Sequence, residues 1–175
     1  MRFLLFFFTL MFSVRAHALV YVEPSLGYFN GRYHYEENFQ GAIEAQTYSD
    51  HGLSYGGRLG LSWLGFQLGP EYLRNNLTID GDAVNINEWA VLLGYRFWYL
   101  RMYAGYIYKA DIADSRYEAG SGPKYGLSFY LYRFMALNLE YRSVVFPTYK
   151  DPTYELRLKN DYAGLALSLS FPFEI

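Results

Sequence analysis

The residues with the clearest chemical potential are acids and arginines placed at alternate positions within otherwise apolar segments. Arg58 lies in the run YGGRLGLSW, and Glu140 and Arg142 lie in LNLEYRSVV. Carboxylate and guanidinium groups form strong bidentate pairs when a fold places them on one common face. The candidate set holds four acids and four bases: Glu23, Glu71, Glu88, Glu140, Arg58, Arg96, Arg101 and Arg142. Because these charges balance, we expect the side chains to form one neutral network in the interior of the fold.

A hydrolytic site would need a nucleophile beside a base, and the chain offers one weak candidate. The histidines that follow residue 18 are His34 and His51. Three polar residues lie near the second of them: Ser49, Asp50 and Ser54. A histidine that takes the proton of a serine hydroxyl is the usual basis of acyl transfer. Polar residues at the rim of a larger fold explain the same pattern with fewer assumptions, so we predict no catalytic residue.

Acidic turns are the other candidate for ligand binding. Asp80-Gly81-Asp82, and separately Asp111 and Asp114, offer carboxylate oxygens to a divalent cation. Asp and Gly are also the residues that turns favour, because both tolerate left-handed backbone angles. The chain has no cysteine, which excludes disulfides and thiol catalysis. We therefore predict no metal site and no cofactor.

The elements that must position the charged residues are recognisable by a two-residue period. From Ala163 onward, the segment DYAGLALSLSFPF (161–173) has large apolar residues at odd positions and mostly small or hydroxylated residues at even ones. Such alternation is typical of a strand with one face in hydrocarbon and the other in a crowded interior. Seven further segments alternate in the same way: about 20–30, 52–63, 66–79, 86–97, 100–111, 124–132 and 135–146. We predict an all-β fold, an eight-stranded antiparallel up-and-down transmembrane β-barrel.

Connection lengths alternate along the chain, which favours a barrel over a soluble sandwich. We expect two-residue turns at 64–65, 98–99 and 133–134, and longer polar segments at 31–50, 79–85, 112–123 and 147–155. In outer-membrane barrels the short turns face the periplasm and the long loops face outside. With eight strands the lumen is just wide enough to be filled by side chains. Pro24, Pro70 and Pro172 fall inside predicted strands, where they indicate bulges or strand ends.

Aromatic residues make up 21% of the chain and concentrate near predicted strand ends. Near the short turns they form a predicted girdle: Trp63, Phe66, Phe97, Trp98, Tyr99, Phe134, Phe171 and Phe173. Towards the long loops lie Tyr28, Tyr55, Tyr72, Tyr106, Tyr108 and Tyr125. Rings of aromatic side chains are expected where a barrel crosses the two membrane interfaces. A sugar- or base-stacking platform is the alternative for the loop tyrosines Tyr33, Tyr35, Tyr149 and Tyr154.

The first 18 residues have the organisation of a secretory signal. Arg2 precedes an apolar core, and Ala16-His17-Ala18 supplies a small-x-small cleavage site. Residues 19–175 then form the barrel domain, with 13 basic and 17 acidic residues and a net charge of −4. Nucleic acid is excluded as a partner, because the sequence has no basic patch to neutralise phosphates.

The signal, the opening VYVEPSLGYFNG, the eight alternating strands and the terminal SLSFPF together resemble the small outer-membrane β-barrels of the OmpA/OmpX type. The resemblance covers essentially all of residues 19–175. It implies a place in the bacterial outer membrane and contact with membrane lipid and lipopolysaccharide. It also implies insertion by the barrel-assembly machinery, for which members of the family usually carry a terminal phenylalanine. Here the last residue is Ile175, and Phe173 lies on the same strand face two residues earlier.

Three functional hypotheses follow. The first is a barrel with a side-chain-filled lumen and a structural or surface-interaction role in the cell envelope. The second is a narrow channel for small solutes, as in OmpW-like barrels. The third is a lipid A-modifying enzyme. Related barrels that remove acyl chains from lipid A use a His-x-Ser pair on one strand. His34 and His51 are the bases available for that chemistry here.

Overall fold

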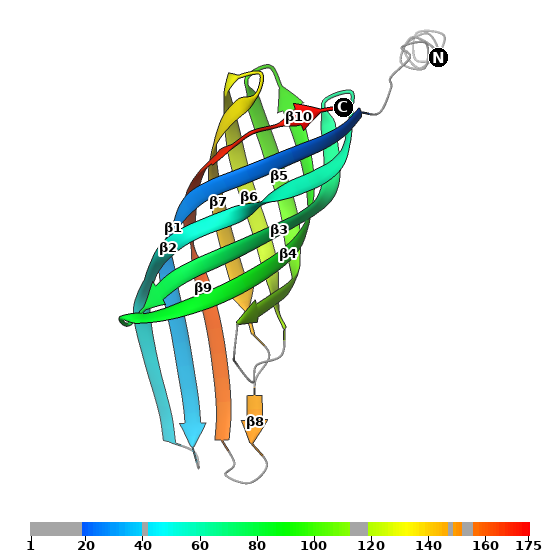
Figure 1. Cartoon of the computed structure of the whole chain (residues 1–175). Coiled ribbons are helices and arrows are strands. Elements are labelled where there is room, and N and C mark those ends of the chain that lie inside the picture. Colours follow the sequence, from blue (N-terminus) through cyan, green and yellow to red (C-terminus); the bar gives the residue numbers. More distant parts are fainter. Residues whose placement is uncertain (1–18, 40–41, 113–118, 147–148, 152–155) are drawn as a thin grey trace, which may run out of the picture.

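The fold is built almost entirely from β-strands (Figure 1). The computed structural model describes residues 19–39, 42–112, 119–146, 149–151 and 156–175, so the predicted signal lies outside the described residues. The strands are β1 (Leu19–Phe39), β2 (Ala42–Trp63), β3 (Phe66–Ile79), β4 (Asp82–Phe97), β5 (Leu100–Ile112), β6 (Gly120–Tyr132), β7 (Met135–Val145), β8 (Tyr149–Asp151), β9 (Leu156–Ser170) and β10 (Phe173–Glu174). No helix among the described residues is long and apolar enough to cross a membrane.

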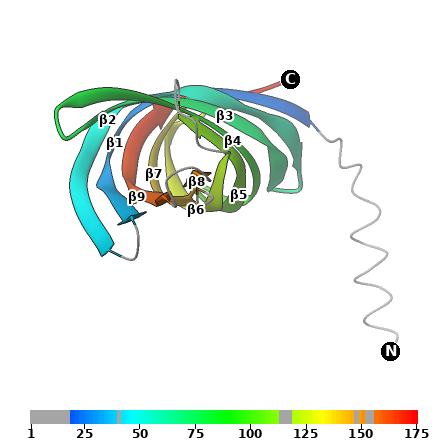
Figure 2. The same ribbon diagram turned by 90° about the horizontal axis from the view of Figure 1, so that it is seen from below.

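Eight of these strands close into one antiparallel ring, which Figure 2 shows end-on. Successive strands pair from β1 to β7, and β7 pairs with β9. β9 closes the ring by pairing with β1, from Ser25 opposite Ser170 to Asn38 opposite Arg157. The short strands β8 and β10 extend the sheet on β9 and β1, respectively. The prediction of an eight-stranded antiparallel up-and-down barrel is confirmed.

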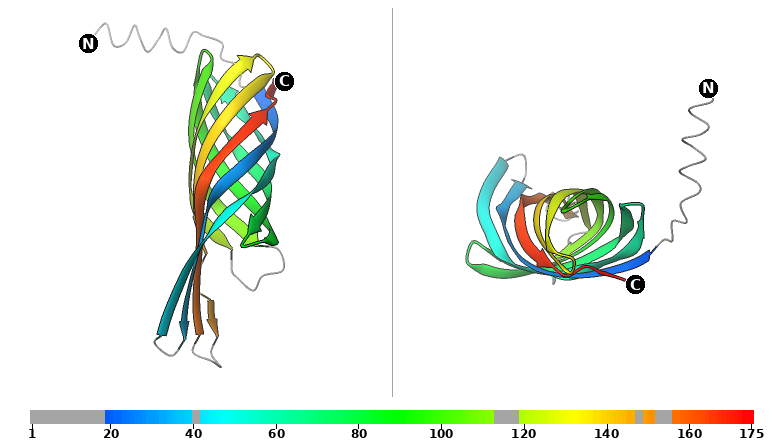
Figure 3. Two further views of the ribbon diagram at one scale, coloured as in Figure 1. Left: turned by 90° about the vertical axis from the view of Figure 1, so that its left-hand side faces the viewer. Right: turned by 90° about the horizontal axis from the view of Figure 1, so that it is seen from above.

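The β1–β2 hairpin is much longer than predicted. Segment 31–50 is not a polar loop, because β1 and β2 stay paired from Leu19–Ser62 to Phe39–Ala42. β9 runs beside β1, so β1, β2 and β9, with the short β8 on the edge of β9, project as one sheet beyond the rest of the barrel (Figure 3). This segment is polar on both faces, and the apolar–polar alternation that marks the other strands is therefore missing from its sequence.

The connection between β3 and β4 is also shorter than the loop predicted at 79–85. β3 and β4 are joined by the two-residue turn Asp80–Gly81, whose φ angles are +52° and +90°. Asp-Gly is a favoured pair for a hairpin turn with two positive φ angles. The acidic turn is thus explained by backbone geometry. The described residues contain no group of acids or histidines able to hold a metal ion, and Asp114 lies outside them.

One β-bulge changes which residues face the lumen. Trp89 pairs with Lys109 and Ala90 pairs with Ile107, so Tyr108 is an extra residue on β5. The alternation of β5 is broken there. In an unbroken strand Lys109 would face inward with Arg101 and Tyr103, but it is exposed and its Nζ lies 2.9 Å from Asp111 Oδ2. A single inserted residue is therefore enough to move a charge from the interior to the surface.

The three prolines behave differently from one another. Pro24 pairs with Gly57 and Pro70 pairs with Val91, and among the described strands no register shift falls at either residue. The expected bulges at these two positions are therefore wrong. Pro172 does mark a strand end, since it separates β9 from β10.

The outer face of the barrel is an apolar belt of exposed side chains, including Leu26, Leu59, Leu93, Leu139 and Leu167. Within the described strands, the outward positions of this belt carry no charged residue. The first outward charges at the end away from the short turns are Arg32, Arg74 and Lys109. All eight residues of the predicted girdle are exposed near the short turns. A surface of this kind would be strongly unfavourable in water and is suited to a bilayer.

Candidate functional site

The centre of the lumen holds a buried ionic cluster. Arg58 donates from Nε to Glu71 Oε1 at 2.7 Å and from Nη2 to Glu140. Lys124 lies between the same two carboxylates, bonded to Glu71 and 2.9 Å from Glu140 Oε2. The hydroxyl of Tyr103 donates to Glu140 Oε1 at 2.5 Å and accepts from Arg58 Nη2 at 3.0 Å. All five side chains are buried, so each charge here depends on its partners for stabilisation.

Glycine makes room for the side chains that cross the lumen. A Cβ atom at Gly126 would lie 2.2 Å from Cζ of Tyr103, and one at Gly60 would lie 2.7 Å from Cε1 of Tyr21. Both distances are well inside van der Waals contact. Any larger residue at either position would therefore displace a tyrosine from the lumen.

Below this cluster, towards the short turns, Arg101 is held by Glu23. Arg101 donates from Nη1 to Glu23 Oε2 at 2.5 Å and from Nη2 to Glu23 Oε1 at 2.6 Å, which is a bidentate pair. Gln67 and Ser128 accept further hydrogen bonds from Arg101 at 3.0 and 2.9 Å. Glu23 also lies 3.5 Å from Arg58 Nη1, and this contact joins the lower pair to the central cluster.

Above the cluster, Arg142 is paired with Glu88. Arg142 Nη1 lies 3.2 and 3.3 Å from the two oxygens of Glu88, and Asn75 donates to Glu88 at 2.6 Å. Arg142 Nη2 is 3.5 Å from Glu140 Oε2, which connects this pair to the centre. The hydroxyl of Tyr162 donates to Glu88 Oε1 at 2.5 Å. The three levels thus form one continuous ionic network along the lumen.

The upper lumen is closed by an apolar plug, which the sequence did not predict. Its buried members include Phe29, Leu77, Ile79, Ile86, Ile107, Val144 and Phe146. Tyr162 joins the plug to the ionic network. Its ring centroid lies 5.9 Å from that of Phe29 and 6.2 Å from that of Phe146, and its hydroxyl donates to Glu88. The lumen therefore has two kinds of filling in series, ionic below and apolar above.

The composition of the ionic network corrects one predicted residue. Arg96 is not part of it: it lies at the short-turn mouth, 31% exposed, and pairs with Glu174 at 3.0 Å. Lys124, which the sequence analysis did not select, takes its place and is completely buried. The network therefore still has four acids and four bases: Glu23, Glu71, Glu88, Glu140, Arg58, Arg101, Lys124 and Arg142. The period of β6 marks Lys124 as inward, opposite in face to Tyr125 and Leu127.

The residues of the hydrolytic hypothesis are not brought together. Asp50 is buried while His51, the next residue on β2, is exposed on the outer face. Ser54 is buried and accepts a hydrogen bond from Arg142 Nη2 at 3.2 Å. The Nδ1 atom of His34 lies 3.1 Å from Thr47 Oγ1 on the projecting hairpin. The described residues around either histidine do not form a His–Asp–Ser arrangement.

Asp50 is nevertheless unusual. It lies beyond the apolar belt, between the exposed polar residues Ser49 and His51, yet its own side chain is buried. Neither carboxylate oxygen accepts a well-formed hydrogen bond within the described structure. Burial raises the pKa of Asp50 from 3.8 to about 6, and the backbone amides of Asp50 and Gly31 offset only part of this shift.

We expect Asp50 to weaken the fold as the pH rises. Its folded-state pKa is raised, so the folded protein binds the proton more tightly than the unfolded chain. The free energy of unfolding should fall between about pH 4 and pH 6 by up to about 3 kcal/mol. Asp50→Asn should remove this dependence and stabilise the barrel at pH 8, as measured by urea unfolding in lipid vesicles. The exposed Asp82→Asn is the control; equal pH profiles for wild type and Asp50→Asn would contradict the prediction.

The comparisons with known proteins agree with this geometry. No protein-family model and no curated protein sequence matches the chain. Among solved structures, Neisserial surface protein A is 14% identical, with a TM-score of 0.51 over 88% of this chain and 97% of that one. At this identity the likeness shows the fold alone. The chain has the fold of an outer-membrane β-barrel.

Two further barrels are more distant. The outer-membrane protease OmpT from Escherichia coli is 9% identical, with a TM-score of 0.45 over 89% of this chain and 97% of that one. OprG from Pseudomonas aeruginosa is 10% identical, with a TM-score of 0.40 over 89% of this chain and 96% of that one. Scores this low carry no argument about this chain. Membership of the OmpA/OmpX type is not shown.

Proposed function

We propose that this protein is an outer-membrane barrel with a sealed lumen and a structural or surface-contact role in the cell envelope. The observation that carries the proposal is the continuous filling of the lumen, from the Arg101–Glu23 pair to Phe146. A solute pathway would have to separate several buried ion pairs and then cross the apolar plug. Breaking one buried pair costs about 3–5 kcal/mol, so a closed lumen is the favoured state.

The location and partners belong to the same proposal. The apolar belt suits a bilayer, here the outer membrane. Residues 1–18 would act as the signal that exports the chain towards it. Arg32 and Arg74 are exposed just beyond the belt on the long-loop side, where they suit the phosphates of lipopolysaccharide. Phe173 is exposed near the end of the strand series and is the proposed contact for the barrel-assembly machinery.

The projecting sheet of β1, β2 and β9 is the proposed surface-contact element. Beyond Asp50, which pairs with Ile79, β2 has no partner strand on its β3 side among the residues that the structure describes. The exposed side chains on this part of β2 include Ile43, Glu44 and Gln46. A sheet with an unpaired edge outside the membrane offers backbone hydrogen bonds to a partner strand.

The two roles can be separated in the bacterium that encodes the protein. In one variant Arg32 is joined to Ser49 by an Asn-Gly turn, which removes the projecting hairpin but keeps the barrel. A purely structural role predicts that this variant restores detergent resistance to a deletion strain as well as wild type does, and that the deletion leaves cell attachment unchanged. A surface-contact role predicts that it restores detergent resistance but not cell attachment. Solute uptake that rises in proportion to the amount of wild-type protein would contradict both roles.

A further inference from the structure

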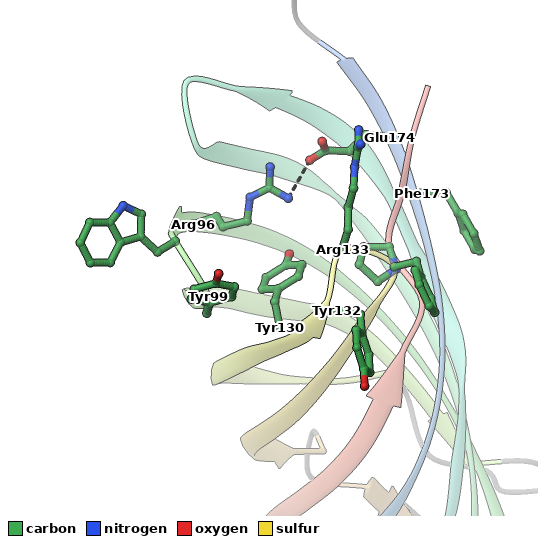
Figure 4. Close-up of a pocket in the computed structure, with 10 residues that line it drawn as sticks. Arg96, Tyr99, Tyr130, Tyr132, Arg133, Phe173 and Glu174 are labelled. Carbon is green, nitrogen blue, oxygen red and sulfur yellow. Dashed lines mark ion pairs between the residues drawn. The ribbon is translucent and has the colours of Figure 1, made fainter.

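The ring of strands is incomplete at the short-turn end. Ser170 opposite Ala136 is the last pair of β7 and β9 in this direction. The chain then leaves β7, and among the described strands β10 pairs with β1 alone, at Tyr21 and Val22. A cleft of about 620 Å³ opens between β10 and the β6–β7 turn (Figure 4). Its lining includes both the buried Tyr130 and the exposed Phe134 and Phe173.

The inner part of the cleft is cationic. It is lined by two guanidinium groups, Arg96 and Arg133, and by a single carboxylate, that of Glu174. Arg96 Nη1 lies 3.0 Å from Glu174 Oε1, but this ion pair is not a well-formed hydrogen bond, so within the described residues the guanidinium keeps donors for a further acceptor. The net charge of the lining is therefore +1 within the described residues. Such a lining favours an anionic ligand with several acceptor oxygens.

Tyr130 adds a neutral donor to the same place. Its side chain is 7% exposed, and its hydroxyl has no hydrogen-bond partner in the part of the chain that the structure describes. Its ring lies 5.4 Å from Cζ of Arg96 and thus beside the guanidinium. Leaving a buried hydroxyl unpaired costs about 1–3 kcal/mol, so a ligand oxygen that accepts from Tyr130 would be stabilised.

The outer part of the cleft is aromatic and lies at the depth of lipid headgroups. Phe134 and Phe173 line the cleft and are exposed on the outer side, and Trp98 and Tyr99 are exposed at the adjacent turn. Exposed aromatic side chains at a strand end mark the membrane–water interface. A ligand in this cleft would therefore present an apolar part to the outside and an anionic part to the arginines.

We propose that this cleft binds the phosphate headgroup of a phospholipid from the adjacent, periplasmic leaflet. Arg96 and Arg133 bind the phosphate oxygens, Tyr130 donates a further hydrogen bond, and the acyl chains lie outside against Phe134 and Phe173. Glu174 holds Arg96 in place when no lipid is bound and competes with the phosphate for it. The proposal requires only that the barrel lies in a bilayer, and does not depend on its surface-contact role.

The test is a titration of the purified full barrel in dodecylmaltoside with monomeric dihexanoylphosphatidylglycerol. Trp63→Phe and Trp89→Phe leave Trp98, at the cleft, as the fluorescent reporter. We expect a saturable signal, no response to dihexanoylglycerol, and binding of inorganic phosphate weaker by roughly tenfold or more. Equal affinity for inorganic phosphate, equal affinity for the phosphate-free lipid, or the lack of a saturable signal would each overturn the proposal.

Substitutions in the lining should change the affinity in opposite directions. Arg96→Gln combined with Arg133→Gln should weaken lipid binding by about tenfold or more, whereas Arg74→Gln, at the far end of the barrel, should not change it. Glu174→Gln should tighten binding by about threefold, because it releases Arg96 from its competitor. Tighter binding cannot arise from misfolding. Glu174→Gln therefore still tests the proposal if the double arginine variant does not fold. Weaker or unchanged binding in Glu174→Gln would contradict the assigned roles.

Discussion

Replacing Lys124 with methionine should destabilise the barrel by about 3–5 kcal/mol. Lys124 is completely buried and lies between Glu71 and Glu140. Methionine has a similar length but no charge, so the ionic network would keep four acids against three bases. The excess negative charge is far from water, and the neighbouring cations Arg58 and Arg142 are already shared among the carboxylates of the network. The free energy of unfolding in phospholipid vesicles, measured by urea titration, should show the loss.

A second substitution, Glu140→Gln, should recover part of the stability lost in Lys124→Met. Glu140→Gln alone should also destabilise the barrel, because Lys124 and Arg58 would lose a carboxylate. The double variant restores neutrality, so its loss should be smaller than the sum of the two single losses by more than about 1 kcal/mol. Lys109→Met, at an exposed lysine outside the lumen, is the matched control and should have little effect. Strictly additive losses would mean that the two charges do not interact in the folded protein.

Replacing Leu93 with arginine should cost roughly 2–4 kcal/mol and slow insertion into vesicles. Leu93 is an exposed leucine on β4, midway between Trp89 and Phe97 on the same face. An arginine there would have to remain in hydrocarbon or deform the bilayer to reach water. The effect can be measured by urea unfolding and by the yield of heat-modifiable, folded protein on a gel.

Asn85→Arg is the matched control for this change. Asn85 lies on the same face of β4 as Leu93, but past Trp89 and outside the apolar belt. A charge at this position should be close to neutral in stability. If Leu93→Arg and Asn85→Arg had equal effects, the outer face would not be in contact with hydrocarbon.

The sequence predicted the ring of strands well because the bilayer imposes a simple rule. Where one face meets lipid and the other meets a filled lumen, every second residue is constrained, and the two-residue period is clear. Beyond the membrane that constraint ends. The extensions of β1 and β2 past Gly31 and Asp50 have polar residues on both faces, so their pairing depends on backbone hydrogen bonds that leave no pattern in the sequence.

The charged character of the lumen was predicted from the sequence, but only some of the residues that form the network were. Alternation assigns Arg58, Glu71 and Glu140 to one common face, but it does not show how far each residue lies along the barrel axis. Arg96 has the correct face but lies below the network, and Lys124 was missed because it stood at the expected start of its strand. The apolar plug was missed for a different reason. Inward apolar residues at strand ends resemble any other hydrophobic positions until the fold places them in one layer.

The sealed lumen is the central claim of this account, and ion conductance tests it most directly. The purified barrel should be inserted into planar lipid bilayers and recorded under an applied voltage at high salt. With the ionic network and the apolar plug in place, we predict a current no larger than that of the bare bilayer. Steady single-channel steps that scale with the number of inserted wild-type barrels would contradict the claim.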